Sequence, residues 1–356
     1  MGILITNITT SWPTINTTIS TSINGSSSTT NVYGIFILVL SVLYGIVCFL
    51  SLIGNSIICI VIINRGIKGS NIYKLLLNLA FADLLITITM PFYVANVLMG
   101  HFIFGTLMCK LTFGLSHLGL RVSMLILTLI SYDRYRALVG KRWQGMSSVK
   151  INTLILVIWL CSIGVVIPQW MHLTVDHIDG FDYCQERWSS ISNRTSYVIS
   201  LFVLLSVIPL LCIIVCHVKI GAHFNKLIED QTLQAAAIHR QRVIKMLTAV
   251  AIFFILCYFP YQIFYVIIFI PNVTIDFRVA VFTSAILRFI TNMHSCINPI
   301  IYGVSSTKMR DDIKRIAMKK RSSTQLSLSK GSNDSRFSKT SLISGNGKRK
   351  TILTDV

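Results

Sequence analysis

The feature that most constrains this chain is a series of long apolar stretches, several of which exceed the roughly 18 residues that indicate a transmembrane helix. Seven of them, separated by polar connections, lie at approximately 33–63, 72–99, 108–136, 150–171, 196–220, 243–270 and 278–302. Only 13% of the 356 residues are charged, whereas a soluble domain carries about 25%. We therefore expect an all-α membrane protein, folded as a bundle of seven transmembrane helices within a domain at 33–304.

The distribution of charge predicts how the bundle is oriented. The net charge of +19 comes from 32 Lys and Arg against 13 Asp and Glu, and thirteen of the basic residues follow Gly303. Basic residues also gather in alternate connections, while five of the seven Asp and Glu in the connections between stretches lie in the others. By the positive-inside rule we expect a multi-pass plasma-membrane protein with its N-terminus outside and its C-terminus in the cytoplasm. This asymmetry indicates membrane orientation and argues against a nucleic-acid partner.

The two ends of the chain have different compositions. Residues 1–32 are uncharged and rich in Ser, Thr and Asn, so we expect an extracellular, disordered and glycosylated N-terminus. Five sequons are predicted to be glycosylated: Asn7, Asn16, Asn24, Asn193 and Asn272. At 305–320, apolar and basic residues alternate at helical spacing, which predicts a short amphipathic helix on the lipid of the inner leaflet, with a plain charged tail as the alternative.

Residues 321–356 are rich in Ser and Lys and are expected to form a disordered cytoplasmic tail with phosphorylation sites. Arrestin is a candidate partner of this tail. The chain ends in Leu353-Thr354-Asp355-Val356, a form that can add to the sheet edge of a PDZ domain through Val356.

The cysteines favour one disulfide. Seven of the nine lie within the apolar stretches, where cysteine is a small buried hydrophobe. Cys109, at the outer end of its stretch, and Cys184 alone lie on the side expected to be oxidising. We predict a Cys109–Cys184 bridge that ties the long 172–195 connection over the mouth of the bundle.

Each stretch also contains a short marker. In chain order these are Gly54-Asn55, Leu79-Ala80-Phe81-Ala82-Asp83, Cys109 with Asp133-Arg134-Tyr135, Trp159, Pro209, Phe254 with Cys257-Tyr258-Phe259-Pro260, and Asn298-Pro299-Ile300-Ile301-Tyr302. Together they resemble the rhodopsin-like (class A) G-protein-coupled receptors over roughly 33–320. The segments 184–188 and 293–299 are most similar to the neuropeptide-receptor groups. The resemblance implies a receptor, not an enzyme, with no cofactor.

The resemblance also implies the signalling residues. Asp83 is expected to face Ser123 and Asn298 around a water or sodium site, and no other metal is expected. Arg134 is expected to be held by Asp133 at rest and released toward a heterotrimeric G protein when the helices move. The remaining implied switch residues are Tyr135, Phe254, Tyr258, Pro260, Pro299 and Tyr302.

Several supporting positions depart from the family pattern. Phe102, Tyr258, His217 and His294 stand where Trp, Trp, Tyr and Asn are common. Arg240 stands where many members place an acid that holds the arginine of the Asp-Arg-Tyr triplet, and Lys141-Arg142 replace a proline and a large hydrophobe that contacts the G protein. The class of G protein is therefore left open.

The ligand face is implied residue by residue. Ser116 occupies the position of an amine-binding Asp, which argues against a monoamine ligand. The resemblance places the pocket at Tyr93, Ser116, His117, Arg121, Gln169, Tyr261, Gln262, Tyr265 and Arg288. A charge near the bilayer centre costs at least ~3 kcal/mol, so the two arginines need partners.

The arginine partners allow two interpretations. In the first, Arg121 or Arg288 awaits a carboxylate, a phosphate or a peptide carbonyl from a ligand. In the second, Arg288 pairs with an acid such as Asp276 or Glu186 and Arg121 bonds backbone carbonyls and waters, while His117 is a neutral packing residue. We expect a receptor that binds an extracellular (neuro)peptide and activates a heterotrimeric G protein. The alternatives are a receptor for a small anionic ligand (a carboxylate, nucleotide or lipid) and a transporter or channel.

Overall fold

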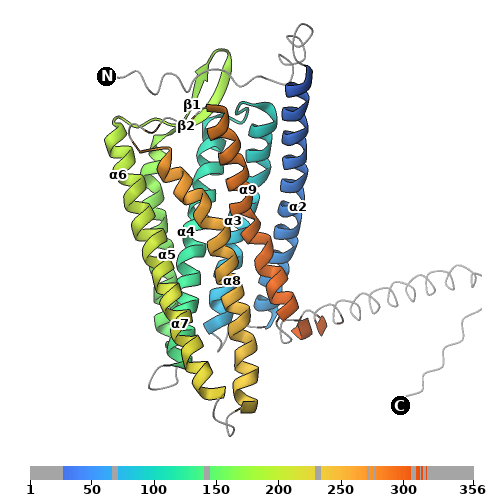
Figure 1. Cartoon of the computed structure of the whole chain (residues 1–356), viewed down its shortest axis with the longest axis vertical. Helices are drawn as coiled ribbons and strands as arrows, with labels where there is room; N and C mark the ends of the chain where they lie inside the picture. The colour runs from blue at the N-terminus through green and yellow to red at the C-terminus, as the bar shows by residue number, and fades with distance from the viewer. Residues whose placement is uncertain are drawn as a thin grey trace, which may run out of the picture. The chain divides into compact units, whose positions relative to one another are not determined.

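The computed structural model describes residues 27–65, 71–139, 145–228, 234–270, 273, 275 and 277–305, together with 310–312, 314, 315 and 318. Its contacts divide the chain into two units, Met1–Ser306 and Thr307–Val356. The described part of the first unit is a bundle of long helices capped by a β-hairpin (Figure 1). In the second unit the described residues have helical backbone.

Seven rods make up the bundle within the described residues, as predicted. They are α2 (Ser27–Arg65), α3 (Asn71–Met99), α4 (Gly105–Leu138), α5 (Ser148–His172), the joined α6 (Ile191–Phe202), η2 (Val203–Val207) and α7 (Ile208–Ile228), then α8 (Gln234–Ile267) and α9 (Phe277–Ser305). The element η2 is a π-helical turn immediately before Pro209. Such turns occur frequently at functional sites.

Six of the seven rods are long and apolar enough to cross a membrane, judged over the described residues. The rod that falls short is α9, although its 29 residues are sufficient in length. Its polar residues lower its mean hydropathy, and several of them, such as Asn292, His294 and Asn298, are buried inside the bundle. A span that contributes this many polar groups to the interior has a lower mean hydropathy than its neighbours.

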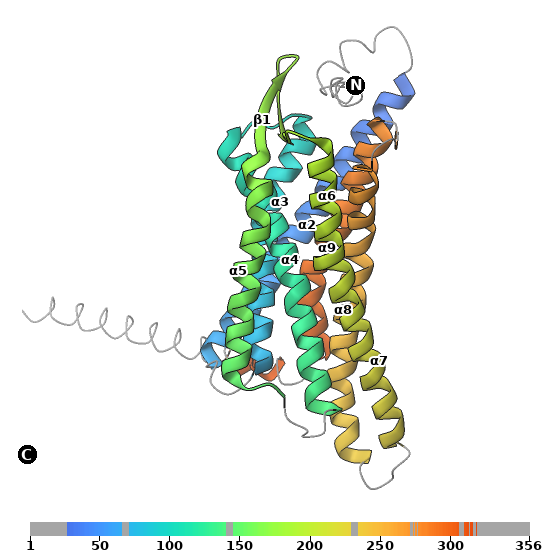
Figure 2. The same ribbon diagram turned by 90° about the vertical axis from the view of Figure 1, so that its left-hand side faces the viewer.

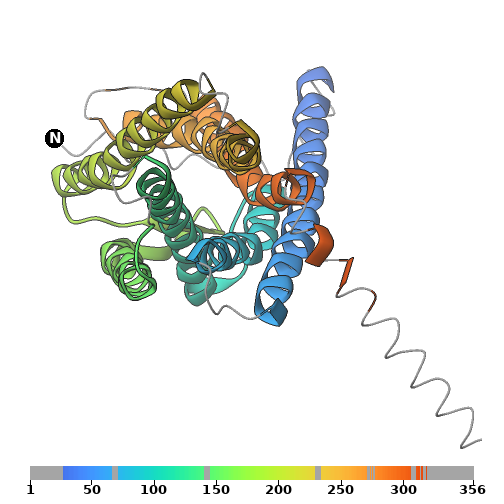
Figure 3. The same cartoon turned by 90° about the horizontal axis from the view of Figure 1, so that it is seen from below.

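The helix that organises the core is α4. It packs against α3, α5 and α7 and also contacts the hairpin, and Figure 3 shows the rods arranged in a ring when viewed along their length. Gly119 of α4 makes the close contact with α3 possible, because a Cβ there would lie 2.7 Å from the carbonyl oxygen of Ala82. Small residues allow membrane helices to approach in this way.

The connection after α5 is an antiparallel hairpin that the sequence analysis did not predict. Strand β1 (Leu173–Ile178) pairs with β2 (Phe181–Glu186), and Asp179 and Gly180 form the turn with φ values of 50° and 83°. An Asp-Gly pair suits a two-residue hairpin turn, which requires positive φ at both positions. The hairpin projects beyond one end of the bundle, called here the hairpin end (Figure 2).

The predicted disulfide is confirmed. Cys109 at the start of α4 is bonded to Cys184 of β2, with the two Cα atoms 5.6 Å apart. Phe102, which stands where the family has Trp, is fully buried and packs with Cys109 and Leu173. The hairpin is therefore fixed to the mouth of the bundle by a covalent bond and an aromatic side chain.

Helix ends differ from the expected limits in two places. Helix α2 begins at Ser27 instead of 33, and α8 begins at Gln234 instead of 243. The length of an apolar stretch indicates only the part of a helix that spans the membrane. Once formed, a helix extends through polar residues at little cost until it reaches a helix-breaking residue. Predictions for Asn7, Asn16, Asn24, Lys141-Arg142, Asn272 and the 321–356 tail lie outside the described residues, as does most of 305–320.

Candidate functional site

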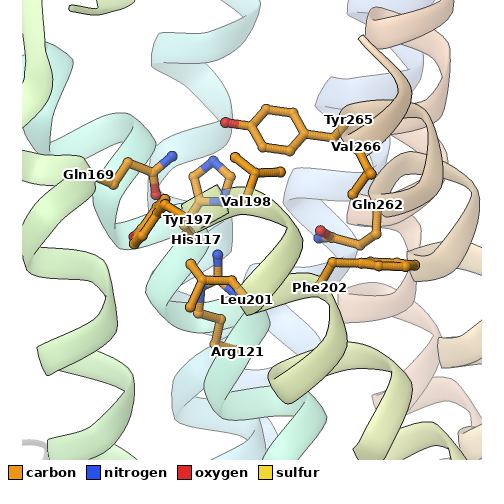
Figure 4. A pocket seen from close by; sticks show the side chains of 10 residues that line it. All are labelled: His117, Arg121, Gln169, Tyr197, Val198, Leu201, Phe202, Gln262, Tyr265 and Val266. Atoms are coloured by element: carbon orange, nitrogen blue, oxygen red, sulfur yellow. The ribbon is translucent and has the colours of Figure 1, made fainter. Parts of the chain in front are cut away.

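A pocket opens inside the hairpin end of the bundle between α4, α5, α6 and α8 (Figure 4). Its lining consists of His117, Arg121, Gln169, Tyr197, Val198, Leu201, Phe202, Gln262, Tyr265 and Val266. Five of these belong to the ligand face predicted from the sequence: His117, Arg121, Gln169, Gln262 and Tyr265. The structure therefore brings together side chains from three separate rods that the sequence only implied to be neighbours.

The wall supplied by α6 was missed. Tyr197, Val198, Leu201 and Phe202 recur at the spacing that places side chains on one face of a helix. That spacing is visible in the sequence and could have identified the wall. Tyr197 is held in place because its hydroxyl donates to the carbonyl of Val165 at 2.5 Å.

A second group of predicted residues gathers around Arg288 of α9. The Arg288 Nη2 donates to the Tyr261 hydroxyl at 2.5 Å. Its guanidinium carbon lies 4.8 Å from the centroid of the Tyr93 ring and 5.2 Å from those of Phe113 and Tyr261. The rings of Tyr261 and Tyr265 are 5.9 Å apart, so the cluster adjoins the pocket. Ser116 belongs to neither group.

The structural interpretation of Arg288 is wrong for one of the two acids named for it. Glu186 forms its ion pair with Arg194, not with Arg288, with Arg194 Nε 3.3 Å from Oε2. The other acid, Asp276, lies outside the described residues. Aromatic faces carry a negative quadrupole that stabilises a cation, so Tyr93, Phe113 and Tyr261 supply the partners that the sequence analysis assigned to an acid.

Glu186 holds two of the residues that line the pocket, a role that the sequence did not reveal. Its Oε1 accepts hydrogen bonds from Gln169 Nε2 at 2.7 Å and from the Tyr265 hydroxyl at 3.0 Å. Its Oε2 accepts from Trp188 Nε1 at 2.9 Å and faces Arg194. One carboxylate at the end of β2 thus joins the hairpin to α5, α6 and α8.

Below the pocket, Tyr258 has a partner for the hydroxyl that distinguishes it from the family's Trp. The Tyr258 hydroxyl lies 3.0 Å from Ser206 Oγ, and both side chains are buried. Ser206 is presented by the π-helical turn η2. The Tyr258 ring stacks on Phe254 at 5.2 Å between centroids, and Phe254 contacts His294 edge-on at 4.9 Å. These contacts lead from η2 and α8 to α9.

Asp83 forms the polar centre of the bundle and meets its predicted neighbours. Its Oδ1 accepts from Ser123 Oγ at 3.2 Å and its Oδ2 from Asn298 Nδ2 at 2.7 Å. The imidazole Nε2 of His294 is 3.4 Å from Oδ1. Hard cations take oxygen ligands, and Asp83, Ser123 and Asn298 all carry side-chain oxygens. A sodium ion at Asp83 stays a prediction.

At the end opposite the hairpin, Asp133 and Arg134 form an ion pair of 2.5 Å. Asp133 is fully buried and also accepts from the backbone N–H of Met146 at 2.9 Å. Tyr135 faces Lys219, whose Nζ is 5.6 Å from the ring centroid. Tyr302 is buried, and its hydroxyl has no partner among the described residues.

His217 links three helices near the same end. Its Nε2 is 3.2 Å from Ser131 Oγ and its Nδ1 is 2.9 Å from Thr248 Oγ1. Ser131 already donates its hydrogen to the carbonyl of Leu127, so it accepts from Nε2–H, and Nδ1 accepts from Thr248. A neutral imidazole in one tautomer therefore satisfies both contacts and connects α4, α7 and α8.

The prolines implied as switch residues lie inside their helices. Pro260 is within α8 and Pro299 within α9, where each removes a backbone hydrogen bond and permits a kink. Gly54 of α2 faces Pro299 so closely that a Cβ would lie 2.6 Å from the proline Cβ. The α2–α9 contact therefore depends on glycine at this position.

Known proteins resemble this chain over most of its length. The description "7 transmembrane receptor (rhodopsin family)" matches residues 54–302. Somatostatin receptor type 3 of Mus musculus is 29% identical over 333 residues, covering 88% of this chain and 75% of that receptor. Neuropeptide Y receptor type 6 of Mus musculus is 28% identical over 302 residues, covering 78% and 80%. C-C chemokine receptor type 8 of Mus musculus is 29% identical over 301 residues, covering 79% and 80%.

Proposed function

This chain belongs to the rhodopsin family of seven-transmembrane receptors, and from that premise we propose that it binds an extracellular peptide at the hairpin end and activates a heterotrimeric G protein at the opposite end. The observation that carries the proposal is the pocket beneath the hairpin, into which polar side chains of α4, α5 and α8 point. Two of the relatives are named for somatostatin and neuropeptide Y. It is a multi-pass membrane protein and not an enzyme.

The character of the pocket supports a peptide. Gln169, Gln262 and Tyr265 offer amide and hydroxyl groups that can exchange hydrogen bonds with a peptide backbone. Val198, Leu201, Phe202 and Val266 form an apolar wall for a side chain. Ser116 lends no charge to the site, so a protonated monoamine would have no counter-ion at that position.

We further propose that the hairpin end is extracellular. Asn193, a predicted glycosylation site, is exposed at the start of α6 close to the hairpin. The proposed topology places 1–32 outside with Asn7, Asn16 and Asn24 glycosylated, as are Asn193 and Asn272. The bundle at 33–304 is followed by an amphipathic helix at 305–320 on the inner leaflet and a cytoplasmic tail at 321–356.

Signal transmission is proposed to follow the buried contacts between the two ends. A ligand in the pocket meets Gln262 and Tyr265 of α8, and the same helix carries Tyr258 and Phe254. Phe254 contacts His294, which stands beside Asp83. A shift of α8 would change these contacts in turn and would separate Asp133 from Arg134. The separation frees the arginine to bind the G protein. Tyr135, Pro260, Asn298, Pro299 and Tyr302 are the other proposed switch residues.

Two cytoplasmic partners complete the proposal. A phosphorylated 321–356 tail would offer negative charge to arrestin, and the C-terminal Val356 would offer a free carboxylate to a PDZ domain. Deletion of the last four residues is expected to abolish PDZ binding in a pull-down while G-protein activation is unchanged.

The main experiment is a peptide screen. Cells expressing the full chain and promiscuous G-protein reporters are exposed to a library in which each peptide is present as a free acid and as an amide. A peptide hit is expected to signal through wild type and to lose signalling, but keep measurable binding, in Arg134→Ala. Absence of any peptide response, with a response to a small acid that Arg288→Ala abolishes, would contradict the proposal in favour of a small-anion receptor.

A further inference from the structure

Arg121 is a buried cation for which the described part of the chain supplies no hydrogen-bond or ion-pair partner. Its side chain is 9% exposed, and it makes no hydrogen bond or ion pair with any residue that the structure describes; its buried Nε is unpartnered. Arg288 and Arg194, by contrast, have a hydrogen bond and an ion pair respectively. The backbone-carbonyl partners considered for Arg121 from the sequence are not found among the described residues.

The guanidinium of Arg121 points into the pocket. Figure 4 shows it below His117 and directed toward the space under Gln169 and Tyr265. None of the ten lining residues is acidic. Glu186, the carboxylate bonded to the lining residues Gln169 and Tyr265, already accepts from or pairs with four groups. The ten residues that line the pocket therefore supply no counter-ion to this cation.

The energetics favour an anionic occupant. An uncompensated arginine inside a membrane bundle is costly, and removing one partner of a buried pair is strongly unfavourable. A carboxylate matches the planar guanidinium with two parallel hydrogen bonds and neutralises the charge. A carboxamide offers one oxygen and no charge, and a phosphate dianion would need a second cation that the lining does not contain.

We propose that this pocket binds the carboxylate of a ligand and that Arg121 pairs with it. The inference rests on the proposed function only in that it takes the pocket as the ligand site. The carboxylate can come from a peptide C-terminus, from an acidic side chain, or from a small free acid, and all three present the same group to Arg121. Gln169 Oε1 is buried and unpartnered; as an acceptor it would meet an N–H of the ligand and not its carboxylate.

The test uses purified full-length chain in lipid nanodiscs and pairs of probes that differ only in charge. N-acetyl-leucine is compared with N-acetyl-leucinamide for a C-terminal source, N-acetyl-aspartyl-amide with N-acetyl-asparaginyl-amide for a side-chain source, and propionate with propionamide for a free acid. Thermal unfolding is followed at constant ionic strength. The acid of at least one pair is expected to raise the melting temperature by about 2–4 °C more than its amide.

Substitutions test whether Arg121 causes the difference between acid and amide. The acid–amide difference is expected to vanish in Arg121→Gln and to persist in the control Arg187→Gln, whose arginine is exposed and pairs with Asp176. If Arg121→Gln fails to fold, Arg121→Lys is used instead and is expected to reduce the acid–amide difference. Lysine keeps the positive charge but cannot form the two parallel hydrogen bonds of a guanidinium. Equal shifts for every acid and amide in wild type, including no shift at all, would overturn the proposal. So would a difference that Arg121→Gln or Arg121→Lys leaves unchanged.

This readout requires no signalling, so it separates the two proposals. If the receptor fails the peptide screen but shows the Arg121-dependent difference, the carboxylate site stands and the peptide-receptor function is overturned. If it responds to peptides but shows no acid–amide difference, the peptide-receptor function stands and the carboxylate site is overturned.

Discussion

Tyr265 of α8 donates a hydrogen bond of 3.0 Å from its hydroxyl to Oε1 of Glu186 at the end of β2. The contact connects a transmembrane helix directly to the hairpin that covers the pocket. Because the same carboxylate also faces Gln169, Trp188 and Arg194, the position of α8 at the hairpin end is coupled to that of α5 and α6.

Glu186→Gln is expected to loosen the junction. The amide keeps one acceptor, but its NH2 group replaces the other oxygen and opposes the donors that Glu186 now satisfies. A buried charged hydrogen bond contributes about 1–3 kcal/mol, which lowers the melting temperature of the purified receptor by several degrees. The control is Asp182→Asn, whose ion pair with His177 is exposed and should leave the melting temperature unchanged. Equal effects of both substitutions would contradict the role given to Glu186.

Tyr258 and Ser206 should behave as a coupled pair. Tyr258→Phe and Ser206→Ala each remove one partner of the same buried hydrogen bond and are each expected to cost about 1 kcal/mol. The double variant should cost less than the sum, because the second substitution removes a bond that no longer exists. Thermal unfolding of the three variants and wild type gives the coupling. Strict additivity would show that the 3.0 Å contact contributes nothing to stability.

His217 is expected to restrain the receptor at rest. Its two contacts, to Ser131 and Thr248, hold α4, α7 and α8 together at the end where G-protein activation is proposed. Ser131→Ala or Thr248→Val removes one hydrogen bond of about 1 kcal/mol, which corresponds to roughly a five-fold shift toward the open state. His217→Phe removes both. Basal signalling in the reporter cells, normalised to surface expression, should rise in that order.

Thr128 provides a control that tests whether the rise in basal signalling comes from the two hydrogen bonds of His217, called here the His217 bridge. Thr128 of α4 also bonds within its own helix, to the carbonyl of Met124, but makes no contact with His217. Thr128→Val should therefore leave basal signalling near wild type. If Ser131→Ala, Thr248→Val and His217→Phe all match wild type as well, the bridge does not restrain the receptor.

The sequence predicted the parts of this molecule that depend on short, spaced signals. Apolar length determined the number of rods, since a membrane span requires about 20 residues. The Cys109–Cys184 bridge followed because two thiols in one compartment allow a single pairing. Asp83 with Asn298 followed from the family markers. In each case the signal lies in the residues themselves and requires no knowledge of side-chain packing.

What the sequence did not predict depends on which groups meet across the bundle. The partners of Arg288 are rings on α3, α4 and α8, and a search for acids overlooks them because a cation is also stabilised by aromatic faces. Glu186 appeared to be a loop acid until the hairpin placed it over the pocket. The π-helical turn that presents Ser206 to Tyr258 depends on hydrogen bonds near Pro209, which have no marker in sequence.

In the absence of ligand, substitution of Arg121 and of Arg288 should change the melting temperature in opposite directions. Arg121→Met removes a buried charge that has no partner among the described residues and replaces it with an apolar chain beside Leu201, so the melting temperature should rise as part of the roughly 3 kcal/mol burial cost is relieved. Arg288→Met removes the bond to Tyr261 and contacts with three rings, which costs about 1–3 kcal/mol. Thermal unfolding of the ligand-free receptor compares them. A fall in Arg121→Met as large as that in Arg288→Met would mean that the apo protein already compensates the Arg121 charge.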